Sequence, residues 1–175
     1  FGSEWPQQQL VATLLSRENR PIVLDADGLN ALAKLTYGQL DLRAPTILTP
    51  HVGEYNRLAE AMGIHADAQN QVEAAEALAQ AYGCIVVLKS DVTVISDGVR
   101  SVEESNGSVI LATGGTGDVL TGIISGILVQ FGKDCISHLF DAAVLGVRVH
   151  AIAGDLFAAE HGNTGMLATD LLQRI

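Results

Sequence analysis

The chain has 175 residues, of which 48% are hydrophobic and 17% are charged, and its formal net charge is −10. This composition excludes a disordered chain and indicates one globular domain with a sizeable core. The negative charge argues against a surface for nucleic acid or for an anionic membrane, so we expect neither partner.

Other features concern the cellular setting of the chain. We find no signal peptide and no apolar run of 18 residues. Cys84 and Cys135 lack the spacing of metal ligands and are too few for a disulfide framework, which predicts reduced thiols and a cytoplasmic protein. Because residue 1 is Phe and not Met, we expect residues 1–175 to be a single domain truncated at its N-terminus.

Helices and buried strands alternate along the predicted secondary structure. In chain order the predicted elements are helix 5–16, strand 21–25, helix 28–35, strand 46–49, helices 53–62 and 70–82, strand 84–89, a hairpin of strands 93–96 and 99–103, and helices 118–131, 137–160 and 169–175. This alternation implies an α/β fold with a mostly parallel sheet covered by helices on both faces. Ligands of such sheets bind at the carboxyl ends of the strands, so the residues there are candidates for a site.

The first strand is followed by DADGLN, residues 25–30. Asp25 and Asp27 are suited to hydrated Mg²⁺, but the same residues also form Asx turns and helix caps, and both interpretations stay open. We assign no metal ligand. Asp25, Asp27 and Glu54 are only candidates for residues near a hydrated Mg²⁺.

The second strand leads into TPHVGEYNRL, residues 49–58. His51, Glu54 and Arg57 can reach one cleft from this turn, where His51 or Arg57 would hold a phosphate or an amide-bearing ring. The alternative is a capped helix start with solvated charges.

Lys89 ends the strand 84–89 and is one of three lysines in the chain. A cation at the carboxyl end of a strand suits a nucleotide phosphate. A solvated lysine at the end of a strand is equally common, and the sequence around Lys89 does not decide between them.

The most informative segment is ATGGTGDVLTGII, residues 112–124. Gly114, Gly115 and Gly117 precede an apolar helix, an arrangement that binds anions through backbone amides. Asp118 adds a carboxylate there, which fits a group that accepts a proton beside phosphoryl transfer, although many first-turn acids only complement the helix dipole. The segment matches neither a P-loop nor a GxGxxG fingerprint.

Three further residues have structural interpretations. His150 is expected to be a hydrogen-bonded core residue in an apolar helix. Gly122 and Gly126 are expected to allow close helix packing.

Taken together, these segments resemble the ADP-dependent NAD(P)H-hydrate dehydratases of the ribokinase-like superfamily. The matching segments are LDADGLNAL (24–32), LTPHVGEYNRL (48–58), VVLKSDVT (86–93), ATGGTGDVLTGIISGIL (112–128), AAVLGVRVHAIAGDL (142–156) and GMLATDLL (165–172). They occur in the same order along nearly the whole chain. The resemblance implies a ribokinase-like three-layer α/β/α fold whose N-terminal part is missing here, with Gly2 at the end of a glycine-rich loop.

The chain departs from the family pattern at three places. Ser90 stands where the family usually has Gly, and Val52 stands in TPHVGE where the family has TPHPGE. Residues 106–111 replace an Asn-Pro-Gly-Met-like approach to the glycine-rich turn. Ser90 and residues 106–111 lie in the expected nucleotide loops.

The resemblance implies a metabolite-repair lyase. NADH or NADPH that has added water at C6 of its nicotinamide (NADHX or NADPHX) is dehydrated at the expense of ADP, which releases AMP and phosphate. Asp118 would be the catalytic residue, and Mg²⁺ would be the cofactor. The implied ADP-binding residues are Lys89, Ser90, Asp91, Val92, Thr93, Ser108, Val109, Ile110, Leu111, Ala112, Thr113, Gly114, Gly115, Thr116 and Gly117. The implied NAD(P)HX-binding residues are Gly2, His51, Val52, Gly53, Glu54, Tyr55, Asn56, Arg57 and Asp118.

Two other functions fit the same residues. One is a ribokinase-like small-molecule kinase for a vitamin-precursor alcohol, and the other is a non-catalytic nucleotide-binding fragment. The expected partners are ADP and NADHX or NADPHX, in a homo-oligomer, with fusion to an NAD(P)HX epimerase or partnership with one as a further expectation.

Overall fold

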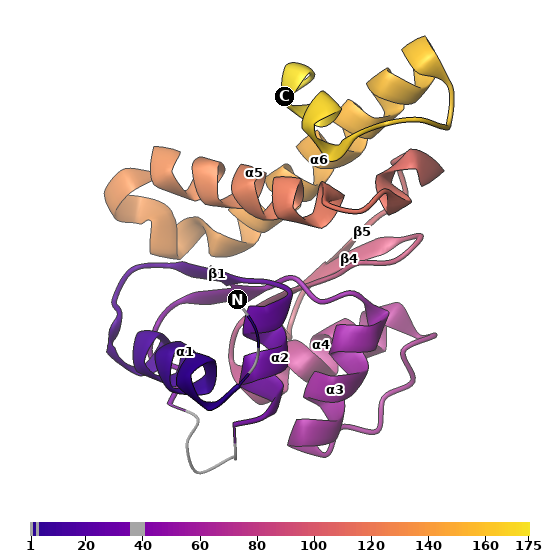
Figure 1. Ribbon diagram of the computed structural model, residues 1–175. Coiled ribbons are helices and arrows are strands. Elements are labelled where there is room, and N and C mark those ends of the chain that lie inside the picture. The colour runs from indigo at the N-terminus through magenta and orange to yellow at the C-terminus, as the bar shows by residue number, and fades with distance from the viewer. Residues whose placement is uncertain (1, 3, 36–40) are drawn as a thin grey trace.

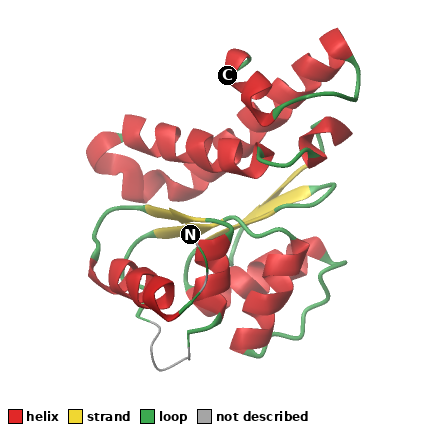
Figure 2. Cartoon of the chain, viewed as in Figure 1, coloured by secondary structure: helices red, strands yellow, loops and turns green. Residues whose placement is uncertain are grey.

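The structure is a five-stranded sheet with helices on both faces. The computed structural model describes residues 2, 4–35 and 41–175. In chain order the elements are α1 (Trp5–Arg17), β1 (Ile22–Leu24), α2 (Asp27–Ala33), β2 (Thr46–Leu48), α3 (Val52–Met62), α4 (Gln71–Tyr82), β3 (Ile85–Leu88), β4 (Thr93–Ser96), β5 (Ser101–Glu104), the 3₁₀ helix η2 (Val109–Ala112), α5 (Thr116–Gln130), η3 (Gly132–His138), α6 (Leu139–His161) and η4 (Ala168–Gln173). Helices α1–α4 lie on one face of the sheet, and α5 and α6 lie on the other (Figure 1). Figure 2 shows the strands as the layer between them, which is the predicted three-layer arrangement.

The strands lie in the sheet in the same order as in the chain, β1-β2-β3-β4-β5. The pairs β1–β2 and β2–β3 are parallel, and β3–β4 and β4–β5 are antiparallel. All strands except β4 therefore run in one direction. The carboxyl ends of β1, β2 and β3 meet at the same edge, which places the three predicted strand-end segments beside one another.

Alternate side chains of the strands enter two separate apolar layers. Leu48 and Leu88 pack with side chains of α1–α4, whereas Ile47, Val87 and Ile95 pack with side chains of α5 and α6. Successive side chains of a strand point to opposite faces, and here both faces are covered. This double burial explains why the strands are continuous apolar runs in the sequence.

Most predicted elements form close to their predicted bounds, and the differences are local. The predicted helix 137–160 begins at Leu139 after η3, and the predicted last helix is the 3₁₀ helix η4. The second strand of the hairpin begins at Ser101 because Asp97 Oδ1 accepts hydrogen bonds from the amides of Val99 and Arg100. This side chain stabilises a longer turn than the pair Asp97-Gly98 predicts. The helix η2 was not predicted.

One expectation from composition was wrong. Among the described residues, Ile136–His161 is long and apolar enough to cross a membrane by length and composition alone. Half of its apolar window is buried inside the protein, where α6 packs against α5 and against the sheet. The apolar character of α6 is explained by this packing, because a core helix passes the same test of length and composition.

The prediction of close helix packing at Gly122 and Gly126 was also wrong. No described atom outside the local backbone lies within 4 Å of a Cβ placed at either position. The close approach of α5 and α6 occurs instead at Gly146, where a Cβ would lie 2.5 Å from Cγ1 of Ile124. Gly122 and Gly126 face an open groove that is described below.

Candidate active site

A cluster of four residues lies at the carboxyl ends of the parallel strands. Lys89 follows β3 and donates from Nζ to Oδ1 of Asp25, which follows β1, at 2.8 Å. Thr121 of α5 donates to Oδ2 of the same carboxylate at 3.1 Å. Gly117 completes the cluster, since a Cβ there would lie 3.3 Å from Lys89 Nζ. The glycine therefore lets the first turn of α5 approach the ammonium group closely.

The glycine-rich turn positions the start of α5. Gly115 is the N-cap residue and has a φ of 91°, a conformation that favours glycine. Thr116 donates from its hydroxyl to the carbonyls of Leu111 and Thr113, at 2.6 and 2.9 Å, which holds residues 111–116 in one conformation. No side chain of the described residues caps this helix. The amide of Thr116 donates to the carbonyl of Thr113, which leaves the amides of Gly117 and Asp118 for an anion.

These residues line a cavity of about 490 Å³, which we call the Lys89 cavity. Its lining residues are Lys89, Ser90, Asp91, Thr93, Asn106, Gly107, Ser108, Val109, Leu111, Ala112, Thr116, Gly117, Leu120, Val147, His150 and Ala151. Ten of the fifteen predicted nucleotide-binding residues are in this set. The predicted residues outside it are Val92, Ile110, Thr113, Gly114 and Gly115. Of these, Ile110 is buried in an apolar cluster with Phe157 and Met166.

Six residues of the lining are absent from the predicted set of contact residues: Asn106, Gly107, Leu120, Val147, His150 and Ala151. Asn106 and Gly107 nevertheless belong to a segment that was expected to form a nucleotide loop. Three of the six belong to α6, whose apolar pattern indicated only a core helix. Their apolar pattern does not indicate contact with a ligand, because they reach the cavity only through the packing of α6 beside the glycine-rich turn.

Ser90 makes a local contact that a glycine at this position would not provide. Its hydroxyl donates to Oδ1 of Asp91 at 2.9 Å. This bond is the largest cause that holds the pKa of Asp91 below its ordinary value, and hydrogen bonds from Gln71 and from the Val92 main chain act in the same direction. The departure from the family pattern therefore lowers the pKa of Asp91, which lines the Lys89 cavity.

His51 and Glu54 form a reciprocal cap at the start of α3. His51 Nδ1 accepts from the amides of Gly53 and Glu54, at 2.9 and 3.4 Å, and Glu54 Oε2 accepts from the amide of His51 at 2.9 Å. The side chain of Glu54 is buried, and that of His51 is 57% exposed. This is the capped helix start that was the alternative to a binding site, and it leaves the His51 ring facing solvent. An isolated parallel β-bridge pairs the main chains of His51 and Lys89, and this pairing places the cap next to the Lys89 cluster.

The other predicted substrate residues are distributed around this edge. Arg57 donates from Nε to Oδ1 of Asn30 at 2.8 Å and lines a separate cavity of about 450 Å³ between α2 and α3. The amide of Gly2 donates to Oδ2 of Asp27 at 2.7 Å. Tyr55 is buried, and its hydroxyl donates to the carbonyl of Ala66. Of the two remaining predicted residues, Val52 is half-buried and Asn56 is exposed.

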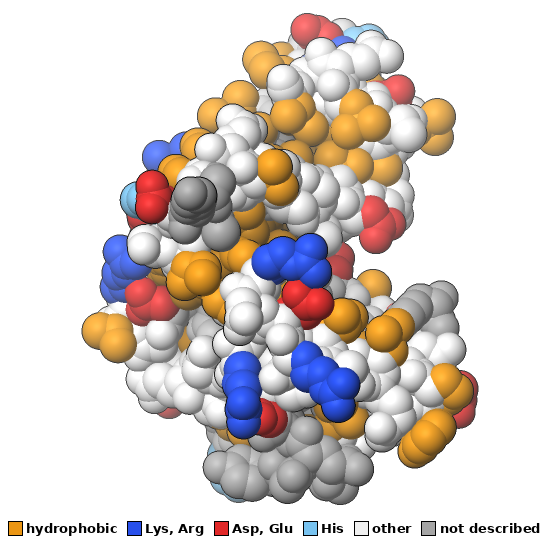
Figure 3. Space-filling model, turned by 90° about the vertical axis from the view of Figure 1, so that its left-hand side faces the viewer, with side chains coloured by type: hydrophobic (Ala, Val, Ile, Leu, Met, Phe, Trp, Pro, Cys, Tyr) orange, Lys and Arg blue, Asp and Glu red, His pale blue; other side chains and the backbone are white. Residues whose placement is uncertain are grey.

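Asp118 lies in the first turn of α5 and is exposed. Its side chain makes no hydrogen bond or ion pair with any other described residue. It stands at the end of a groove of about 950 Å³ along α5 and α6, which is lined by Asp118, Val119, Gly122, Ile123, Gly126, Ile127, Gln130, Leu145, Val149, Ile152, Leu172, Arg174 and Ile175. Figure 3 shows hydrophobic side chains gathered on this upper part of the molecule.

The candidate carboxylates do not form a metal centre by themselves. Within the described parts of the chain, no three His, Cys, Asp or Glu side chains are grouped so that they could hold a metal ion. Asp25 is engaged by Lys89 and Thr121, Asp27 by Gly2, and Glu54 by the cap of α3. A divalent cation at this edge would therefore depend on ligands that a bound molecule brings.

Comparison with known proteins relates this geometry to a family. A family model described as NAD(P)H-hydrate dehydratase matches residues 2–175. A bifunctional NAD(P)H-hydrate repair enzyme from Salinibacter ruber is 40% identical over 169 residues, which cover 95% of this chain and 30% of that protein. The corresponding enzyme from Escherichia coli is 36% identical over 178 residues, covering 98% and 32%. The chain thus spans only 30–32% of the length of these curated relatives.

Solved structures agree with this relationship. An ADP/ATP-dependent NAD(P)H-hydrate dehydratase from Bacillus subtilis, co-crystallised with ATP and Mg²⁺ and soaked with CoA, matches with a TM-score of 0.81 and 33% identity. The match covers 99% of this chain and 60% of that chain. A ribokinase-like superfamily protein from Enterococcus faecalis matches with a TM-score of 0.79 and 26% identity over 99% of this chain and 57% of the other. These matches confirm the predicted ribokinase-like fold.

Proposed function

Because the chain belongs to the NAD(P)H-hydrate dehydratase family, we propose that it carries out the ADP-dependent dehydration of NADHX and NADPHX to NADH and NADPH. The observation that carries this proposal is the Lys89 cluster, in which a cation and an uncapped helix start converge on one cavity. The unpaired carboxylate of Asp118 stands in the same turn.

In this proposal the Lys89 cavity holds ADP. Lys89 and the amides of Gly115–Gly117 would face the phosphates, because a cation and helix-start amides stabilise negative charge. The apolar side chains of Leu120 and Val147 would cover the nucleoside. Because the overall charge is −10, an anionic ligand depends on such local partners.

The proposed chemistry is phosphoryl transfer followed by elimination. The C6 hydroxyl of the hydrated nicotinamide attacks the β-phosphorus of ADP, Asp118 accepts the hydroxyl proton, and AMP leaves. The C6–O bond then breaks with phosphate as the leaving group, while the lone pair of the ring nitrogen supplies electrons. Loss of a proton from C5 restores the C5–C6 double bond. Water is thereby removed at the expense of one phosphoanhydride bond.

The hydrated dinucleotide would bind on the side of α3. His51 presents an exposed ring next to the Lys89 cluster, and Arg57 offers a guanidinium group in the neighbouring cavity between α2 and α3. Gly2 and Asp27 lie at the same edge. A dinucleotide is long enough to contact both regions.

We also propose that Mg²⁺ accompanies the nucleotide. Mg²⁺ is usually held by one or two carboxylates together with substrate phosphates, and this fits a site whose carboxylates are otherwise engaged. Asp25, beside Lys89, is the carboxylate in position to contact it or its water ligands. When bound, the ion would neutralise part of the phosphate charge.

The remaining expectations stay predictions. The relatives from Salinibacter and Escherichia are named as bifunctional repair enzymes, which supports fusion to an epimerase or partnership with one in this protein too. The homo-oligomer and the cytoplasmic location rest on the sequence argument. Sedimentation velocity of the full-length protein tests the first, and cell fractionation tests the second.

Phosphate release by the full-length protein tests the proposed activity. With ADP, NADHX should give AMP, phosphate and NADH in equal amounts, with NADH measured by its absorbance. ADP with a vitamin-precursor alcohol should give none of these products above background. A phosphorylated alcohol without NADH formation would instead indicate the kinase, and ADP binding without any turnover would indicate a non-catalytic domain.

A further inference from the structure

His150 is buried and interacts with the main chain of Thr116, as the prediction of a hydrogen-bonded core histidine requires, but it is also part of a cavity wall. It is 8% exposed and lines the Lys89 cavity from α6. Its Nε2 atom is buried and has no hydrogen-bond partner among the residues that the structure describes. Buried polar atoms in native proteins almost always have a partner, and a ligand group or a water inside the cavity would supply one here.

The environment keeps the imidazole neutral. Burial is the main cause that lowers the pKa of His150 below its ordinary value, and the positive charge of Lys89 acts in the same direction. The main chain of Thr116 opposes this shift only in part. A neutral imidazole has one donor and one acceptor nitrogen, so the nitrogen that does not bond the Thr116 main chain remains for a group inside the cavity.

The neighbours of α6 locate His150 along the cavity. On one side the ring is close to Thr116, at the anion-binding start of α5. On the other side Ala151 contacts the segment after β5, since a Cβ on Gly107 would lie 3.5 Å from the Cβ of Ala151. His150 therefore lies between the end of the cavity that suits phosphates and the segment after β5, which forms another part of the wall.

We propose that His150 hydrogen-bonds the ribose hydroxyls of the nucleoside diphosphate and so selects ribonucleotides. The proposal rests on the function proposed above, because it assumes that ADP occupies the Lys89 cavity. The phosphates already have Lys89 and the helix amides as partners. A hydroxyl group can donate or accept, so it satisfies either tautomer of a neutral ring, and the ribose is the part of ADP that joins phosphates to base.

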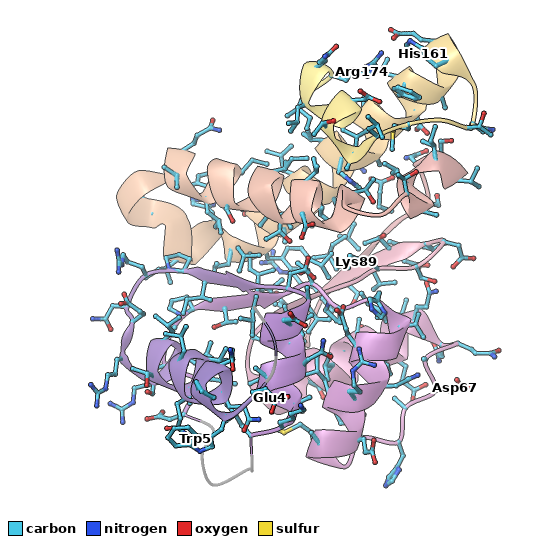
Figure 4. The ribbon with its side chains drawn as sticks, viewed as in Figure 1. Glu4, Trp5, Asp67, Lys89, His161 and Arg174 are labelled. Atoms are coloured by element: carbon cyan, nitrogen blue, oxygen red, sulfur yellow. The ribbon has the colours of Figure 1, made fainter. Side chains whose placement is uncertain are left out.

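Calorimetric titration with two ligands tests the proposal on the full-length protein. The wild type should bind ADP more tightly than 2′,3′-dideoxy-ADP. His150→Leu should weaken ADP binding by roughly 3- to 10-fold, the scale of one neutral hydrogen bond, and should leave binding of the dideoxy nucleotide unchanged. His150→Gln, which retains a donor and an acceptor, should recover part of the preference for ADP. His161→Leu is the matched control on the same helix, at the end distant from Lys89 (Figure 4).

A second measurement needs no substitution. The nitrogen-15 resonances of the His150 ring should shift when ADP binds and shift much less with the dideoxy nucleotide. Equal losses of both ligands in His150→Leu, or equal ring shifts with both, would overturn the proposal and leave the dehydratase function in place. A wild type that binds neither nucleotide would instead overturn the proposed function, and this inference with it.

Discussion

At the scale of single residues, two charged side chains near the start of α5 have different proposed roles. Lys89 binds the nucleotide, and Asp118 accepts a proton. Lys89 is paired with Asp25 and faces the first turn from the sheet, whereas Asp118 is exposed and unpaired among the described residues. A carboxylate at an anion-binding helix start repels phosphate. Asp118 is therefore expected to weaken nucleotide binding and to act only in proton transfer.

The substitution Asp118→Asn tests this division. It keeps the shape of the side chain and removes both its charge and its ability to accept the proton. We expect ADP affinity to be retained or increased, and turnover to fall by roughly 10²-fold or more, the scale of a positioned general base. Turnover and calorimetric affinity are measured on the full-length protein. Substantial remaining turnover would mean that Asp118 only complements the helix dipole.

Removal of Lys89 should have two separable effects. Lys89→Met keeps the aliphatic stem but leaves the carboxylate of Asp25, whose side chain is 11% exposed, without its cation. We expect weaker ADP binding and a loss of about 1–3 kcal/mol of stability, less than for a fully buried pair because Lys89 is itself 21% exposed. The double variant Asp25→Asn, Lys89→Met should recover stability without recovering affinity. Recovery of both would place Lys89 outside the phosphate site.

At the scale of elements, Glu104 connects the sheet to α6 next to the Lys89 cavity. Arg148 of α6 donates from Nε to its Oε2 at 3.0 Å, and Asn106, which lines the cavity, donates from Nδ2 to its Oε1 at 2.5 Å. Burial pushes the pKa of Glu104 upward, but these hydrogen bonds outweigh it and hold the pKa below its ordinary value. The charged carboxylate thus fixes the end of β5 and the first residue of the cavity wall.

This contact predicts a specific pH dependence. Because the folded-state pKa of Glu104 is lowered, its stabilising contribution is fully present above the unfolded value of about 4.3 and is lost as the pH falls through the folded pKa. Glu104→Gln should lower the Tm at pH 7 and flatten the decline of the Tm below about pH 4.3. The neighbouring exposed residue offers a control, since Glu103→Gln should leave the curve unchanged. If the Tm declined at low pH in the same way in both variants, Glu104 would not be the source of this pH dependence.

The elements differ in how far the sequence predicts them. The strands β2 and β3 were predicted from apolar runs. Every residue of these strands is buried, because both faces of the sheet are covered, and every position is therefore apolar or nearly so. The 3₁₀ helix η2 was not predicted, since this short turn depends on contacts such as that of Thr116 with Leu111. In the site, the sequence around Lys89 and the glycine-rich turn itself indicated possible contact with a phosphate. The residues around His150 gave no such indication, because its position beside the cavity depends on how α6 crosses α5.

At the scale of the whole molecule, the Lys89 cavity is shared between the sheet and the helical layer of α5 and α6. Its walls come from the β3–β4 turn, the segment after β5, the start of α5 and the middle of α6. A ligand that contacts all four binds the folded state and not the unfolded chain. Nucleotide binding should therefore stabilise the entire domain.

Thermal unfolding measures this coupling. ADP at about 100 times its Kd should stabilise the protein by about 2.7 kcal/mol, which corresponds to a rise in Tm of roughly 5–10 °C for a domain of this size. Adenosine, which lacks the phosphates, should give a smaller rise at the same concentration. An equal rise with both ligands would show that the phosphate end of the cavity contributes nothing.

The order of strands in the sheet, which equals their order in the chain, also has a consequence for synthesis on the ribosome. Each new strand can pair with the one made just before it, and α1–α4 are interleaved with the strands, so their face is covered as the chain emerges. The opposite face, with Ile47, Val87 and Ile95, stays open until α5 and α6 have been translated. Nascent chains that pause before residue 116 would present a half-covered sheet, the kind of partly folded species that aggregates or requires a chaperone.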